Sequence, residues 1–235
     1  MKAIKLWHIS AAFFAVCAML NLYGCIASNQ ALADTVKPAL LTLLCLTTMT
    51  YLAPKADMGR HEVKLLACAQ LFGFGGDTAL IGSDAFALFA AGIGLFLIGH
   101  IFYITLFGSK SFKGLKAGHW FVAMFCCLAL VSVLIKVIGV SGALLAPMAI
   151  YGFTLTFLIF SALAGALRFK TLTWWLLTAG AVLFTFSDSL IAIRTFGQLS
   201  PLMSGFGVMS TYLAAQTLLA IGSTRLILKT SESTI

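Results

Sequence analysis

Two of the seven acidic residues, Asp77 in FGFGGDTAL and Asp188 in FTFSDSL, stand inside apolar sequence. A charge within hydrocarbon costs about 2.5–3.5 kcal/mol on insertion scales, so such residues usually face the interior of a helical bundle and serve a function. Two carboxyl groups in an apolar pocket favour keeping one proton between them, which suits general acid–base catalysis. The alternative for each is a structural hydrogen bond between helices, or contact with water near the surface. The other five are expected to be solvated: Asp34, Asp57, Glu62, Asp84 and Glu232.

Further polar side chains interrupt the apolar runs. Tyr212 and Gln216 are four residues apart and share one helix face, where they could bind a headgroup or an aspartate, or simply join helices. His100 stands one turn before Tyr103. Lys37 is expected to cap the outer end of its helix, where it could pair with an aspartate or extend to the membrane surface.

The depth of these residues follows from the helical rise. At 1.5 Å per residue from the expected cytoplasmic ends, Asp77 lies about 20 Å and Asp188 about 25 Å along its helix. Both then fall in the outer half of the membrane and could meet across the bundle. His100 comes out at only about 10 Å, so a supporting or structural role fits it as well as a catalytic one.

The elements that position these residues are membrane helices. Hydrophobic residues make up 61% of the chain and charged residues 9%, whereas soluble domains have about 45–50% and 25%. Apolar runs of nearly 20 residues recur, each able to cross about 30 Å of hydrocarbon, and their continuity excludes the alternating strands of a barrel. The sequence therefore predicts one all-α, polytopic membrane domain over residues 1–235, with about eight helices at 8–27, 38–53, 63–83, 85–107, 119–137, 143–165, 172–193 and 204–226.

The basic residues predict the orientation of these helices. With eight spans both termini share one side, which receives twelve basic residues, whereas the other side receives three: Lys37, Lys136 and Arg194. The positive-inside rule then makes both termini cytoplasmic, with the 108–118 loop inside and the 29–36 loop outside. The net charge of +8 therefore reflects topology and contact with anionic lipids, and no nucleic-acid partner is expected.

The first helix resembles a cleavable signal peptide, because Lys2 and Lys5 precede an apolar run that ends at Ala31-Leu32-Ala33. We expect it to remain uncleaved. The six cysteines all fall in apolar spans and none forms a CxxC pair, so they are expected to be small buried residues and not disulfides or a metal site.

Glycines crowd the region around Asp77 and His100. Small residues let helices approach closely, which is the expected reason for their presence. A groove for a lipid chain is the alternative. The residues are Gly73, Gly75, Gly76, Gly92, Gly94 and Gly99.

Taken together, these segments resemble the YhhN family of membrane proteins, an eight-span family that includes the animal lysoplasmalogenases. The pieces occur in the family's order and cover essentially the whole chain. They are Lys37-Pro38, Gly76-Asp77 followed by Leu80, Gly99-His100 with Tyr103, Ser187-Asp188 followed by Leu190, and Tyr212 with Gln216.

The resemblance implies a membrane hydrolase that cleaves the vinyl ether bond of lysoplasmalogen-type lipids to a fatty aldehyde and a glycerophospho-alcohol. It implies that Asp77 and Asp188 are catalytic, and that the partners are an ether lipid or lysophospholipid substrate and membrane lipids. Because the sequence has no histidine cluster, we expect no metal or other cofactor. We expect the protein in a bacterial cell membrane. The implied pocket residues are Lys37, His100, Tyr103, Tyr212 and Gln216.

Two carboxyl groups suit this chemistry. A general acid protonates the alkene carbon, water adds to the resulting oxocarbenium ion, and the hemiacetal collapses. One aspartate would be the acid, while the other would stabilise the cation and activate water, as in glycosidases. Lys37 or Arg194 could bind the phosphate, because both are expected on the outer face.

Other functions compete with this interpretation. A small transporter or proton-coupled protein would also use intramembrane aspartates, and the similarity between FGFGGDTAL and FTFSDSL would fit a repeat of four helices. A zinc-dependent membrane hydrolase is disfavoured, because only His100 lies deep in a span and zinc needs at least three ligands. A retinal protein would need a lysine in mid-membrane, and Lys37 is too peripheral.

Overall fold

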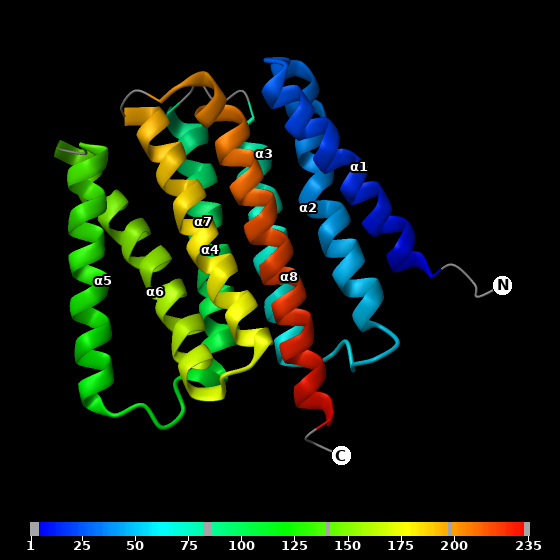
Figure 1. Ribbon diagram of the computed structural model, residues 1–235, viewed down its shortest axis with the longest axis vertical. Coiled ribbons are helices and arrows are strands. Elements are labelled where there is room, and N and C mark those ends of the chain that lie inside the picture. The colour runs from blue at the N-terminus through cyan, green and yellow to red at the C-terminus, as the bar shows by residue number, and fades with distance from the viewer. Residues whose placement is uncertain (1–4, 82–85, 140–141, 197–198, 233–235) are drawn as a thin grey trace. The chain divides into compact units, whose positions relative to one another are not determined.

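The computed structural model of the chain describes residues 5–81, 86–139, 142–196 and 199–232, so Asp84 lies outside the described residues. Within them the chain forms eight α-helices and no strands, which confirms the predicted all-α class (Figure 1). Two short segments stand outside these helices, a 3-10 turn at Gly142–Leu144 and a π-helical turn at Met203–Gly207. The helices are α1 Leu6–Ile26, α2 Gln30–Leu52, α3 His61–Ala79, α4 Phe86–Ser111, α5 Ala117–Ile138, α6 Leu145–Phe169, α7 Leu172–Phe196 and α8 Val208–Glu232.

Seven of the described helices are long and apolar enough to cross a membrane, which makes the chain an integral membrane protein. The exception is α3. Its 19 residues include Glu62, Lys64 and Asp77. The charges at its start explain why α3 has less uninterrupted apolar sequence than its neighbours.

The second helix begins earlier than predicted. The expected loop at 29–36 is wrong, because α2 starts at Gln30 and the chain turns within Ala27–Asn29. The side chain of Asn29 caps α2 by accepting a hydrogen bond from the Leu32 amide, at 3.1 Å. Pro38 is tolerated inside α2, and Lys37 accordingly lies two turns into the helix instead of capping its outer end.

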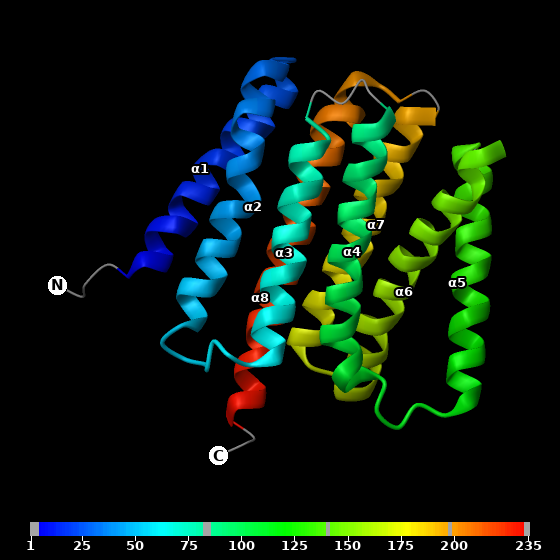
Figure 2. The same cartoon turned by 180° about the vertical axis from the view of Figure 1, so that it is seen from behind.

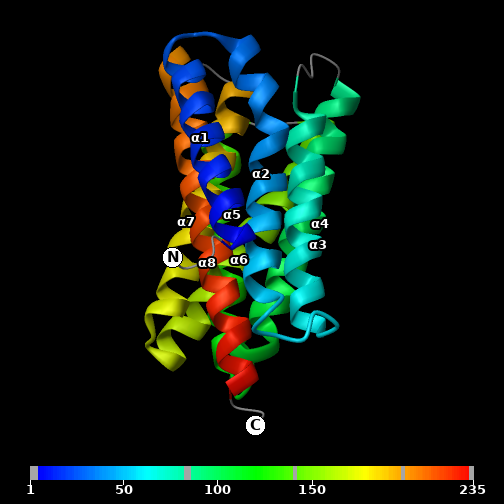
Figure 3. The same cartoon turned by 90° about the vertical axis from the view of Figure 1, so that its right-hand side faces the viewer.

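A contact with α1 explains why this polar segment is helical. The buried Asn21 side chain donates from Nδ2 to the Ala33 carbonyl oxygen at 2.9 Å. A Cβ atom added at Gly24 would come within 3.0 Å of the Ala33 amide nitrogen, so the two backbones lie close together. The first turns of α2 are therefore held against the end of α1, beside which α2 runs in Figure 3.

The chain divides into two compact units, Met1–Phe102 with Ala220–Ile235, and Tyr103–Leu219. The first unit holds α1, α2, α3, the first part of α4 and the last part of α8. Buried Thr48 on α2 donates to Gln70 Oε1 on α3 at 2.8 Å and joins these two helices. The prediction of one domain over 1–235 stays a prediction.

Glycines bring α3 and α4 together in the first unit. A Cβ atom at Gly76 would lie 2.9 Å from the Phe96 ring, and one at Gly99 would lie 3.1 Å from the Ala69 carbonyl oxygen. These glycines therefore allow close helix approach, which was their expected role. Gly94 differs, because a Cβ atom there would meet nothing within 4 Å.

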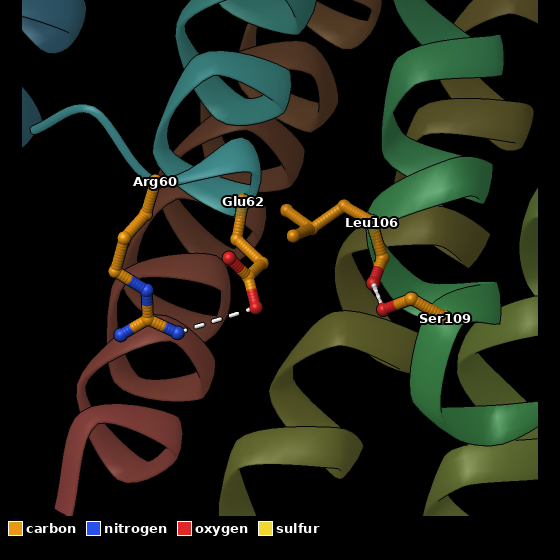
Figure 4. Close-up of polar contacts among 4 residues, drawn as sticks. All are labelled: Arg60, Glu62, Leu106 and Ser109. Carbon is orange, nitrogen blue, oxygen red and sulfur yellow. Dashed lines mark hydrogen bonds and ion pairs between the residues drawn. The ribbon is translucent and has the colours of Figure 1, made fainter. Parts of the chain in front are cut away.

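An ion pair lies at the N-terminal end of α3. Arg60 Nη2 and Glu62 Oε1 are 3.2 Å apart, and both side chains are partly exposed (Figure 4). A pair in such a place contributes about 0–1 kcal/mol. Figure 4 also shows Ser109 donating its hydroxyl to the Leu106 carbonyl oxygen within α4, at 2.8 Å.

The second unit holds the last part of α4, then α5, α6, α7 and the first part of α8. A left-handed turn at Lys170, with φ of 49°, reverses the chain between α6 and α7. Across this pair, Trp174 fills the space that a side chain at Gly165 would need. Pro147 lies in the first turn of α6, where its missing N–H leaves no intrahelical hydrogen bond unmade.

Candidate active site

Asp188 is buried between helices of the second unit, with 6% of its surface exposed. The hydroxyl of Tyr151 on α6 donates a hydrogen bond to its Oδ2 atom. Tyr151 is itself buried, so the bond is shielded from water. The neighbouring Ser187 donates to the Val208 carbonyl oxygen at 3.0 Å, which joins α7 to the start of α8. Asp188 therefore sits on a segment of α7 that is tied to helices on two sides.

Tyr212 and Gln216 of α8 lie against the same part of α7. Gln216 Nε2 donates to the Tyr212 hydroxyl at 3.4 Å, as their shared helix face allows. The Tyr212 ring meets Phe184 edge to face with 5.5 Å between ring centroids. Phe184 is one turn before Asp188 on α7, so Tyr212 lies about one turn from the level of the aspartate. Gln216 is a further turn along α8, toward Leu219, which packs at Gly180 of α7.

Tyr103 also belongs to the second unit and is buried. Its ring lies 5.8 Å from that of Phe107. Phe107 in turn meets Trp174, near the start of α7, with 6.4 Å between centroids. These aromatic contacts tie this part of α4 to the end of α7 opposite to Asp188.

Asp77 is buried in the last turns of α3, with 2% of its surface exposed. It follows Gly76, at which α3 packs directly against Phe96 of α4. The sequence prediction that this carboxyl group lies inside the protein is therefore confirmed for the residue itself. Its catalytic role stays a prediction.

His100 is fully enclosed as well, with 2% exposure. The preceding Gly99 lies against Ala69, which is eight residues and about 12 Å before Asp77 along α3. His100 therefore stands about two turns from the level of Asp77. Lys37 on α2 is half-buried and forms no salt bridge within the described part of the chain.

Tyr151 belongs to this candidate site, although the sequence motifs do not indicate it. It is one of three tyrosines in the middle of apolar helices, and only Tyr103 and Tyr212 were singled out. The available signal was a phenol inside an apolar run, because a buried tyrosine hydroxyl usually has a hydrogen-bond partner. Its partner Asp188 lies 37 residues away, a pairing that only the packing of α6 on α7 decides.

No group of three or more His, Cys, Asp or Glu side chains that could hold a metal ion occurs in residues 5–81, 86–139, 142–196 and 199–232. The cysteines of these segments are all free thiols. That the reaction needs no metal stays a prediction.

Comparison with known proteins identifies relatives of this chain. The chain is 30% identical over 184 residues to mouse lysoplasmalogenase TMEM86B, a match that covers 78% of this chain and 72% of the relative. The human lysoplasmalogenase TMEM86B is 27% identical over 79% of this chain and 73% of its own. The rat protein of that name is 31% identical over 64% of this chain and 57% of its own. No solved structure matches.

The sequence model of the YhhN family matches residues 32–223. That range covers most of the chain and contains every residue singled out above from the sequence as catalytic or pocket-lining. The chain belongs to the YhhN family.

Proposed function

We propose that this protein is a membrane hydrolase that cleaves the vinyl ether bond of lysoplasmalogen-type lipids. The relatives named lysoplasmalogenase, at 27% to 31% identity, support this activity. The observation that carries it is the buried carboxyl group of Asp188, which accepts a hydrogen bond from Tyr151 inside an apolar helix pair. Intramembrane carboxyl groups of this kind are rare without a function.

The reaction needs a proton donor and a water-activating base. An acid protonates the alkene carbon remote from the ether oxygen, and positive charge develops on the carbon bonded to that oxygen. Water adds to this carbon and loses a proton to the base. The hemiacetal then releases the glycerophospho-alcohol and becomes a fatty aldehyde, so one water is consumed for each bond cleaved.

The hydrogen bond at Asp188 suits it to the role of base. Its Oδ2 atom accepts a hydrogen bond from the Tyr151 hydroxyl, as the ionised, acceptor-only form of a carboxyl group does. Tyr151 would keep the carboxylate oriented, since both residues are buried and their helices are packed together. Asp77, the other residue predicted to be catalytic, would then be the acid.

The decisive experiment is turnover by the purified protein. It should release fatty aldehyde from a lysoplasmalogen but not from the saturated 1-alkyl analogue, because that analogue has no double bond to protonate. Activity should persist in EDTA. Loss in chelator with recovery in zinc would contradict the two-carboxylate mechanism, and ion-dependent flux into liposomes without aldehyde release would favour a transporter. Localisation in a bacterial cell membrane remains part of the proposal.

A further inference from the structure

A long apolar groove runs between α5 and α6, entirely within the second unit. In Figures 1 and 2 these helices converge where α5 ends and α6 begins, and diverge toward their other ends. The groove lies between the diverging halves and has a volume of about 960 Å³. Its walls are built mainly of apolar side chains, among them Val122, Cys126, Leu130, Ile159, Leu163 and Leu167.

One end of this groove is basic. Lys116, His119 and Arg168 line it there. The Lys116 amide donates to His119 Nδ1 at 3.1 Å, so a neutral imidazole carries its proton on Nε2 and keeps a donor available. Arg168 uses one nitrogen for the Lys110 carbonyl oxygen at 3.5 Å, which leaves its other N–H groups for a ligand. A basic end on an apolar groove is complementary to an anionic headgroup with a hydrocarbon chain.

The dimensions fit a lipid chain. From Gly118 to Leu130 the groove follows α5 for about 18 Å, which exceeds the roughly 15 Å of hydrocarbon in one leaflet. The volume lies near the top of the range of about 300–1,000 Å³ that is usual for ligand pockets.

A phosphate bound at the basic end of the groove cannot belong to a lysoplasmalogen that is reacting at Asp188. Arg168 is 17 residues and about 25 Å along α6 from Tyr151, which contacts Asp188. In a lysoplasmalogen the phosphate and the vinyl ether are attached to the same glycerol unit. A phosphate held at Arg168 would therefore keep the vinyl ether far from Asp188. This step rests on the proposed function.

A second copy of the chain fits the groove less well. Two copies in one membrane share an orientation, so a symmetric pair meeting at this groove would bring two identical basic ends to the same level. Like charges placed opposite each other oppose such an association. An anionic lipid has the complementary charge.

We infer that the α5–α6 groove binds an anionic phospholipid of the surrounding bilayer, with the phosphate at Lys116, His119 and Arg168 and an acyl chain along the apolar walls. This lipid is not consumed by the reaction. It occupies a site separate from the buried carboxyl group of Asp188.

Native mass spectrometry of the full chain tests this inference. The protein is offered equal amounts of phosphatidylglycerol, phosphatidylcholine and a lysoplasmalogen, the first two with identical acyl chains. One phosphatidylglycerol should be retained in preference. The double variant Lys116→Gln, Arg168→Gln should weaken its retention about fivefold for each charge removed. Gly118→Leu should abolish retention, because Gly118 lines the groove and a Cβ atom there meets nothing within 4 Å.

Matched variants serve as controls. Lys113→Gln removes a loop charge that does not line the groove, and Gly94→Leu adds the same side chain at an equally open helical glycine elsewhere. Both should retain the lipid as the parent protein does. Equal retention of the two phospholipids, a lysoplasmalogen adduct that the groove variants lose in place of the phosphatidylglycerol adduct, unchanged binding in the groove variants, or a protein dimer instead of a lipid adduct would each overturn the inference. Diacyl phosphatidylglycerol and phosphatidylcholine have no vinyl ether bond to hydrolyse, so their retention is read independently of the proposed reaction, and a failure of that reaction would be seen separately.

Discussion

At the scale of single residues, the protein places charged groups where they are costly. Asp77 and Asp188 are nearly inaccessible, and the latter accepts a hydrogen bond from Tyr151. Each side chain would be cheaper to bury as an apolar residue of similar size. Their presence therefore calls for tests that separate chemistry from packing.

Replacing either aspartate by asparagine should cut turnover at least about a hundredfold, the usual contribution of general acid–base catalysis. Folding should survive in Asp77→Asn and Asp188→Asn, because asparagine keeps the size and part of the hydrogen bonding. Aldehyde release by the purified variants measures the effect. Asp57→Asn, in an exposed turn, is the control and should change little. Variants that lose folded protein while the surviving fraction stays fully active would make the aspartates packing groups.

Tyr151→Phe should lower kcat ten- to a hundredfold with little change in KM. The variant keeps the ring but removes a hydrogen bond to a carboxylate, an interaction that is worth about 1.5–3 kcal/mol. The kcat and KM values of the detergent-purified variant measure this. Tyr23→Phe, on an exposed surface of α1, is the matched control. Normal kcat in Tyr151→Phe with a lower unfolding temperature would restrict Tyr151 to a structural role.

At the scale of elements, close contacts at glycines decide how α3 and α4 pack. Gly76 leaves no room for a side chain, because an added Cβ atom would lie 2.9 Å from three atoms of the Phe96 ring. Gly76 immediately precedes Asp77 in the chain, so this contact also fixes the position of the Asp77 carboxyl group. Gly94, on an open face of α4, carries no such constraint.

Gly76→Ala should therefore destabilise the protein by about 1–3 kcal/mol, as is typical of overpacking. Gly94→Ala should be neutral or slightly stabilising, because alanine is the better helix former and the site is open. Thermal unfolding of both variants in the same detergent measures the difference. Equal unfolding midpoints for the two variants would show that the α3–α4 contact accommodates the added methyl group without loss of stability.

At the scale of the whole molecule, basic residues predict how the chain lies in the membrane. Lys110, Lys113 and Lys116 cluster around the loop between α4 and α5, whereas the turn between α1 and α2 carries none. The positive-inside rule places the first of these connections in the cytoplasm and the second outside.

Cysteine labelling in intact cells measures this orientation. In a background without reactive native thiols, a cysteine at Ser28 should react with a membrane-impermeant reagent, and a cysteine at Lys113 should react only after lysis. Ser28 is the position to label, because it lies in the short turn between α1 and α2, and α2 begins at Gln30. Labelling of the Lys113 position in intact cells, with protection of Ser28, would show that the orientation is the reverse of the predicted one.

The sequence by itself determined the helical class, the membrane environment and the burial of the key polar groups. Long apolar runs with few charges leave no other way to satisfy backbone hydrogen bonds in lipid, so eight helices could be predicted from composition and spacing alone. The buried states of Asp77, His100 and Gln216 follow from the same apolar surroundings. The ordered motifs also pointed to the YhhN family, which the family match confirms.

Tertiary structure alone decided the partners of these groups. The polar sequence at the start of α2 predicts a loop, but in the structure this segment is helical. Asn21 of α1 donates a buried hydrogen bond to the Ala33 carbonyl oxygen there. Tyr151 and Asp188 lie on different helices, so local spacing contains no information about their hydrogen bond. The groove between α5 and α6 depends on the angle between two uniformly apolar helices. Hydropathy determines which segments enter the membrane, whereas close packing between segments distant in sequence determines which side chains meet there.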